Sequence, residues 1–184
     1  SPHIDRVIFS ILPEETVMLT NLLTQQIDLI PRISHDRLVD IETAKSIRSI
    51  NYDSKKFSFI GWNCANPLFS TKMRRAFTQA INKEEIINTL LQGFGHPMKG
   101  PFLTSVWAFD ENIKDINYDL TSAKSILQTE GWVDKNGDGI REKNGEPLKF
   151  SIKFYKSRRH QDAAVMVQSQ LRKIGAEIVI QQLD

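Results

Sequence analysis

The sequence LKFSIKFYKSRRHQDAAVMVQSQLRKIGAEIVIQQL, residues 148–183, carries two apolar runs on either side of an amphipathic segment. Apolar and polar side chains alternate over 148–154, which predicts a strand, and a second apolar run over 176–183 predicts another. Between them, residues 159–174 place apolar side chains at helical spacing, and Gly175 is the expected helix stop. Strand, helix and strand in this order predict a parallel, right-handed βαβ unit.

The residues before this unit alternate between strand-like runs and amphipathic segments. Strands are expected over 7–11 and 56–63, the second one buried on both faces. Helices are expected from Glu14, from the N-cap Ser34, over 71–81, from the N-cap Asn82 to Gly93, and from the N-cap Thr121 to Gly131. We therefore predict an α/β fold, with a mixed sheet that has helices on both faces and the βαβ unit at one end.

Length and charge narrow the classes of function. A chain of 184 residues suits one core, so residues 1–184 are expected to form a single domain or one lobe of a larger protein. Because the 24 Lys and Arg residues are nearly balanced by 22 Asp and Glu residues, the chain has no broad positive field, and no nucleic-acid partner is expected. No apolar run approaches the roughly 18 residues that span a bilayer. The start, Ser1-Pro2-His3, is typical of a mature chain or an excised fragment.

The sequence lacks the common motifs of catalysis and of zinc binding. Cys64 is the single cysteine, so no intramolecular disulfide and no Cys/His zinc cluster can form, and we expect it to be a buried small residue. There is no phosphate-binding Gly-rich loop, no nucleophile elbow and no His-Glu-x-x-His. We expect no enzyme activity and no cofactor, and an uncharacterised enzyme domain is kept only as an alternative.

Three groups of short motifs cover most of the chain. The first joins IGWN (60–63) and NPLF (66–69) to MRRAF (73–77) and AINKEEII (80–87). The second joins GFGHP (93–97) to YD (118–119) and AKSIL (123–127), and the third joins GDGI (137–140) to QSQLRKIG (168–175). Taken together, they resemble family 5 of the bacterial extracellular solute-binding proteins, which bring oligopeptides, dipeptides or nickel chelates to ABC importers. The departures, such as Gln25-Gln26 for Gly-Glu, are conservative.

The resemblance implies a fold, a function and a location. It implies most of the second lobe of a type II periplasmic-binding-protein-like fold, with the first lobe and the C-terminal part of a full-length member outside this chain. Such a protein captures a small solute, here an oligopeptide, between two lobes that close on a hinge and delivers it to an ABC permease of the inner membrane. The implied location is periplasmic or extracellular and includes lipid-anchored forms.

A basic run follows the first strand of the βαβ unit. It lies just before a helix N-terminus, where open α/β sheets place their ligands. In the resembled family this turn lines the cleft and can supply a basic group to a peptide carboxylate. Five candidate ligand-binding residues follow: Tyr155, Lys156, Arg158, Arg159 and His160. A solvated basic turn is the alternative, and His160 by itself does not indicate a metal site.

Three further candidates lie outside this turn. Trp62 and Asn63 end a predicted strand, and they either face the cleft or fill the core. Trp107 lies in the segment 93–118, which is too long for an ordinary connection and therefore indicates a functional loop. Trp107 either stacks on the ligand or anchors the loop to the domain, and anchoring is the favoured reading.

The loop 134–145 begins like an EF-hand calcium loop. Asp134, Asn136 and Asp138 occupy the first, third and fifth positions, which supply oxygen ligands. The twelfth position, where a bidentate Glu is required, holds Gly145. A solvated turn is favoured, and a small calcium-binding module using this loop remains the alternative function.

Overall fold

A computed structural model describes residues 3–34, 37–52, 54 and 56–183. The chain divides into two compact units, residues 1–54 and 55–184, each of which packs mainly within itself. The single domain expected over 1–184 therefore stays a prediction.

The smaller unit contains two short helices, α1 (Glu15–Leu23) and α2 (Leu38–Glu42). Its buried apolar side chains are Leu19 and Leu22 of α1 and Ile41 of α2. The helix expected after Glu14 is thereby confirmed; its buried side chains Leu19 and Leu22 lie three residues apart, as on one face of a helix, whereas Leu23 is 40% exposed.

Two expectations for this unit are wrong. Residues 7–11 form no strand, and their side chains are exposed, because no described strand pairs with them. Ser34 does not cap α2, whose N-cap is Arg37. The Ser34 hydroxyl instead donates a hydrogen bond to Glu15 Oε2 at 2.6 Å, which ties the loop before α2 to the first turn of α1.

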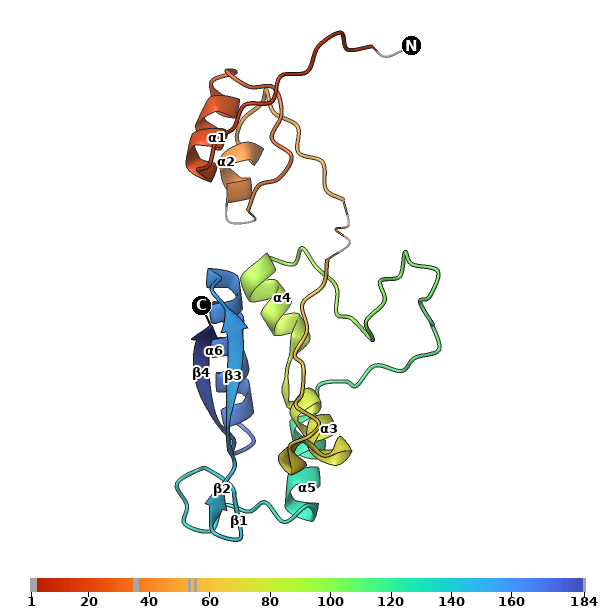
Figure 1. Ribbon diagram of the computed structural model, residues 1–184, viewed down its shortest axis with the longest axis vertical. Helices are drawn as coiled ribbons and strands as arrows, with labels where there is room; N and C mark the ends of the chain where they lie inside the picture. Colours follow the sequence, from red (N-terminus) through yellow and green to blue (C-terminus); the bar gives the residue numbers. More distant parts are fainter. Residues whose placement is uncertain (1–2, 35–36, 53, 55, 184) are drawn as a thin grey trace. The chain divides into compact units, whose positions relative to one another are not determined.

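The larger unit is built on the predicted βαβ unit. It consists of β3 (Lys149–Tyr155), α6 (Arg158–Arg172) and β4 (Glu177–Leu183), and Figure 1 shows the two strands running side by side in the same direction. The strands are parallel, in a register that extends from Lys149 opposite Glu177 to Tyr155 opposite Leu183. The prediction for residues 148–183 is confirmed.

The two faces of this strand pair differ in burial. Phe150 and Ile152 of β3 lie beside Ile178 and Ile180 of β4, and this face packs against the helices. The opposite face, which was also expected to carry helices, is exposed in the described part of the chain. The α/β class is confirmed, but the strands of the described residues form two sheets: this parallel pair and a small antiparallel hairpin of β1 (Glu142–Lys143) and β2 (Glu146–Pro147).

The core of the larger unit contains a cluster of four aromatic rings. Phe77 of α3 (Thr71–Ala80) is fully buried, and its ring centroid lies 5.5 Å from that of Trp62 and 5.1 Å from that of Phe150. Phe69, in the short 3₁₀ turn η2 (Pro67–Phe69), completes the cluster at 5.2 Å from Phe150. The strand expected over 56–63 is wrong: the described residues of this segment pair with no other strand, and only its end inserts into the core.

Local capping fixes the remaining helices. Asn82 caps α4 (Lys83–Leu91) as predicted, because its Oδ1 accepts a hydrogen bond from Glu85 N at 3.0 Å. The cap of α5 (Leu120–Thr129) is Asp119, not Thr121: Asp119 Oδ1 accepts from the backbone N of Ser122 at 2.9 Å.

One buried amide joins α6 to the start of α4. Gln170 is 2% exposed, and its Oε1 accepts a hydrogen bond from Asn82 N at 3.1 Å. Its Nε2 donates to Glu85 Oε2 at 2.9 Å. Since a buried amide without partners is costly, these bonds fix the orientation of the two helices.

Gly175 ends α6 at a place where a side chain has no room. Its φ is +84°, and a Cβ built there would lie 2.7 Å from Arg141 Cγ. The aliphatic part of the Arg141 side chain is held at this point because its Nε donates to Ile174 O at 3.0 Å and its Nη1 donates to Trp132 O at 2.7 Å. The left-handed conformation expected at Gly175 is confirmed, as it is at Gly131, where φ is +87°.

We expect Gly175→Ala to lower the free energy of unfolding by about 3 kcal/mol, since left-handed strain adds to a clash with Arg141. Gly137→Ala is the matched control, because Gly137 has a φ of +78° but no atom within 4 Å of a built Cβ. Strain alone should cost that variant about 1 kcal/mol. Urea denaturation of both variants measures the difference, and equal losses would contradict the clash with Arg141.

Candidate functional site

The basic turn lies at the carboxyl end of the parallel strand pair. β3 ends at Tyr155, which is 73% exposed, and α6 begins two residues after Lys156 with Ser157 as its N-cap. The side chains of Lys156, Arg159 and His160 are also exposed. The structure thus leaves these candidates exposed where β3 ends and α6 begins, at the position that the strand and helix predict.

The charges of this turn are mostly unpaired. Arg158 Nε lies 3.9 Å from Asp162 Oδ2, one helical turn further along α6. Among the described residues, no carboxylate forms an ion pair with Lys156 or Arg159. Two solvated cations and an aromatic ring are therefore free to contact an anionic ligand.

Trp62 and Asn63 lie away from the basic turn. The Trp62 ring packs 6.3 Å from Phe150, near the start of β3, whereas Tyr155 ends that strand five residues, or about 17 Å, further on. Asn63 is exposed, and its Oδ1 accepts a hydrogen bond from Ala65 N at 3.2 Å. The core-filling alternative therefore describes Trp62, and Asn63 shapes the turn that follows.

Trp107 is 96% exposed. The anchoring role favoured from the sequence is therefore wrong, because an anchor would be buried against the domain. A role in binding ligand stays a prediction for this residue.

The expectation that Cys64 is buried is also wrong. Cys64 is exposed, and its Sγ lies 2.6 Å from an Arg74 guanidinium nitrogen. The reason is the unpaired backbone of residues 56–63: the chain turns at Asn63, so the residue after the predicted strand does not enter a sheet.

In the loop 134–145, the carboxylate oxygens of the candidate calcium ligands accept hydrogen bonds from the backbone of the loop itself. Asp134 accepts hydrogen bonds from the backbone N of Gly137 at 2.8 Å and of Gly139 at 2.9 Å. Asp138 Oδ1 accepts from Ile140 N at 2.7 Å. Across the described residues, no group of three His, Cys, Asp or Glu side chains is placed to hold a metal ion. These bonds support the solvated-turn interpretation of this loop.

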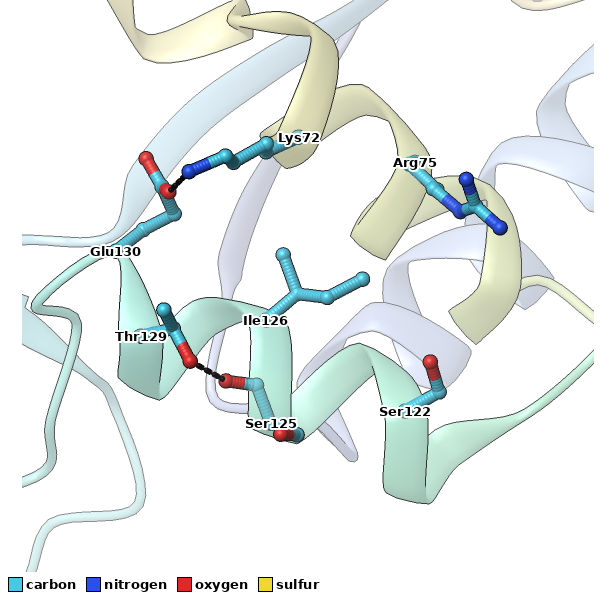
Figure 2. Close-up of a pocket in the computed structure, with 7 residues that line it drawn as sticks. All are labelled: Lys72, Arg75, Ser122, Ser125, Ile126, Thr129 and Glu130. Carbon is cyan, nitrogen blue, oxygen red and sulfur yellow. Dashed lines mark hydrogen bonds and ion pairs between the residues drawn. The ribbon is translucent and has the colours of Figure 1, made fainter.

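An open depression of about 400 Å³ lies between α3 and α5. Figure 2 shows Ile126 between Lys72 and Arg75, and the Lys72 ammonium meets Glu130 Oε1 at 2.8 Å. The hydrogen bond and charge of Glu130 raise the pKa of Lys72 above its usual range. None of the residues predicted for ligand binding lines this depression.

Sequence patterns missed an ion pair between Lys83 and Asp115, whose Nζ and Oδ1 lie 2.6 Å apart. The partners are 32 residues apart in sequence, so no local spacing connects them. One signal was present: Lys83 is the first residue of α4, where the helix dipole disfavours a cation.

The family to which this chain belongs follows from its match to known proteins. Residues 1–184 match the model of the bacterial extracellular solute-binding proteins, family 5 Middle, and the chain belongs to this family. Within the described residues, no helix has the length and apolar character needed to cross a bilayer.

The curated relatives are binding proteins. The chain is 30% identical over 186 residues to the oligopeptide-binding protein AppA of Bacillus subtilis, covering 98% of this chain and 34% of AppA. It is 28% identical to the nickel-binding periplasmic protein of Escherichia coli, covering 96% of this chain and 35% of that protein. The chain thus spans about a third of the length of these relatives.

A solved structure confirms the fold. The structure of Bacillus subtilis AppA in complex with a nonapeptide matches 95% of this chain and 35% of that chain, with a TM-score of 0.77 and 29% identity. The periplasmic-binding-protein-like fold that the resemblance implied is thereby confirmed.

We expect calcium at about 10 mM, above the roughly 1 mM Kd of the weakest EF-hand loops, to leave the melting temperature of this chain unchanged. The Asp134 oxygens already accept backbone hydrogen bonds, and Gly145 supplies no carboxylate. Thermal melts with calcium and with EDTA measure this. Asp134→Ala is the control: it should lower the melting temperature equally in both buffers, whereas a calcium-dependent rise in the unchanged chain would restore the metal-binding alternative.

Proposed function

We propose that this chain is part of the substrate-binding component of an ABC importer. In this proposal the complete protein captures an oligopeptide or a similar small solute between two lobes and delivers it to a membrane permease. It works in the periplasm or outside the cell, in a free or a lipid-anchored form. Membership of the family supports this function, and so do relatives named for binding oligopeptides, dipeptides and nickel.

The observation that carries the proposal is the exposed basic turn between β3 and α6. Lys156 and Arg159 are cations without a carboxylate partner among the described residues, and Tyr155, the residue before Lys156, has an exposed ring. A peptide brings the complementary groups, a terminal carboxylate for the cations and apolar side chains for the ring. Binding of this kind needs no covalent chemistry, only placed charges, hydrogen bonds and apolar contacts.

The terminal carboxylate gives a direct test of this surface. We expect the complete protein to bind a peptide with a free carboxyl terminus about tenfold more tightly than the same peptide with a terminal amide, since a charge-assisted hydrogen bond contributes about 1.5 kcal/mol or more. Lys156→Ala/Arg159→Ala should abolish this preference. Isothermal titration calorimetry measures the four affinities.

The matched control removes two positive charges elsewhere. Lys124→Ala/Lys135→Ala changes two exposed lysines of α5 and the 134–145 loop, and it should retain the preference for the free carboxylate. A preference that survives in the Lys156/Arg159 variant would show that the basic turn does not recognise the carboxylate.

We expect the 184-residue chain alone to show no calorimetric binding of di- to pentapeptides at micromolar concentration, while the complete protein binds them. A ligand held by part of a cleft keeps one face in water, and losing about 4 kcal/mol of contacts weakens binding roughly a thousandfold. Micromolar binding by the 184 residues alone would instead make this chain a self-sufficient binding module.

A further inference from the structure

The segment between α4 and α5 is a closed loop with internal order. Figure 1 shows it leaving α4 and returning to α5 as a long excursion without helices or strands. Its two limbs meet around a small cavity lined on one side by residues 99–102 and on the other by Phe109, Asp110 and Ile113. The limbs therefore contact each other at this cavity.

Lys83 closes the base of this loop. Its Nζ lies 2.6 Å from Asp115 Oδ1 on the second limb and donates to Met98 O on the first limb at 3.3 Å. The Lys83 and Asp115 side chains are 30% and 26% exposed, so the pair is only partly screened by solvent. Asp115 Oδ1 also accepts a hydrogen bond from Ile116 N at 2.8 Å, which fixes the carboxylate.

The position of Lys83 in α4 indicates that its charge acts on the loop and not on the helix. As the first residue of α4 it lies at the positive end of the helix dipole, where a cation is unfavourable and an acidic side chain is favourable. Glu84 and Glu85, the next two residues, follow that preference. The cation at Lys83 therefore serves the contacts with Met98 and Asp115.

Trp107 lies on the turns that join the two limbs. Val106 N donates to Leu103 O at 3.0 Å, and Phe109 N donates to Val106 O at 2.9 Å, so backbone bonds order both sides of the tryptophan. Val106 and Phe109 are half-buried, whereas Trp107 is 96% exposed. An exposed indole on an ordered turn is suited to bury its large apolar face against a ligand.

We propose that Lys83 is a positioning residue: its ion pair with Asp115 closes the base of the loop and holds Trp107 where it stacks on the captured ligand. This role rests on the proposed peptide-binding function. Without the ion pair the two limbs separate, and the ligand must then order the loop as it binds.

The test uses the complete natural protein that contains this chain. Lys83→Met keeps the length of the stem and removes the charge, and Asp115→Asn keeps an Oδ1 that accepts from Ile116 N. We expect amide hydrogen exchange over residues 99–113 to accelerate about tenfold in each variant, and the peptide Kd to rise about tenfold. Lys114→Met, which removes an exposed charge from the same loop, should change neither quantity.

Two combined variants separate positioning from general destabilisation. The charge exchange Lys83→Asp/Asp115→Lys should restore most of the exchange protection, since a carboxylate at the start of α4 is favourable. Trp107→Ala should weaken peptide binding without accelerating exchange at the base of the loop. Adding Lys83→Met to Trp107→Ala should weaken binding no further, because the ion pair acts through the tryptophan.

Each outcome has a stated meaning. Additive losses of affinity for Lys83→Met and Trp107→Ala would overturn the proposal. So would amide hydrogen exchange over residues 99–113 that stays unchanged in both Lys83→Met and Asp115→Asn. If the unaltered protein binds no peptide, the function itself is wrong, and the ligand contact of Trp107 is overturned with it. The exchange measurement still decides in that case whether Lys83 holds the loop.

Discussion

The packing of the larger unit depends on the contacts of one fully buried side chain, Phe77. From α3, its ring packs against the rings of Trp62 and Phe69 and against Phe150 at the start of β3. The sequence separates Phe77 from Phe150 by most of the unit, so this contact joins the helical part to the βαβ part. An aromatic ring buries about 150 to 250 Å² of surface, which makes this cluster a dominant favourable term for packing. This packing holds the start of β3, the strand at whose carboxyl end the basic turn lies.

Charges in this unit fall into two groups with different roles. Arg141 and Lys83 donate to backbone carbonyls at close range, and each thereby fixes a turn or a loop. Lys156 and Arg159 stay solvated at the end of β3. Partnered cations contribute to the fold because their hydrogen bonds replace those to water, while solvated cations stay available to a ligand. Arginine and lysine therefore stabilise the fold at some positions and form a binding surface at others. Which of the two roles a residue has depends on whether its cation has a hydrogen-bond partner in the protein.

The hydrogen bonds of the 134–145 loop show how one motif supports two interpretations. Asp134 and Asp138 stand where calcium ligands stand in an EF-hand, yet their oxygens accept from backbone N–H groups two to five residues further on. Asx-type turns and calcium loops both favour Asp, Asn and Gly at these spacings, because both need short polar side chains and left-handed glycines. The side-chain bonds in the folded chain distinguish the two interpretations, and composition does not.

The sequence alone determined the elements whose signals are local. The alternation over 148–154, the helical spacing over 159–174 and Gly175 were enough to predict the parallel βαβ unit, and Asn82 was enough to predict the start of α4. It also placed the basic turn at the end of β3, because that position depends only on chain order.

Tertiary structure alone decided the rest. Residues 7–11 and 56–63 have strand-like side chains, but a strand needs a partner that sequence does not reveal. The packing of the partly buried Trp62, the exposure of Trp107 and the pairing of Lys83 with Asp115 likewise depend on which distant residues meet, and this is decided only when the whole unit has folded.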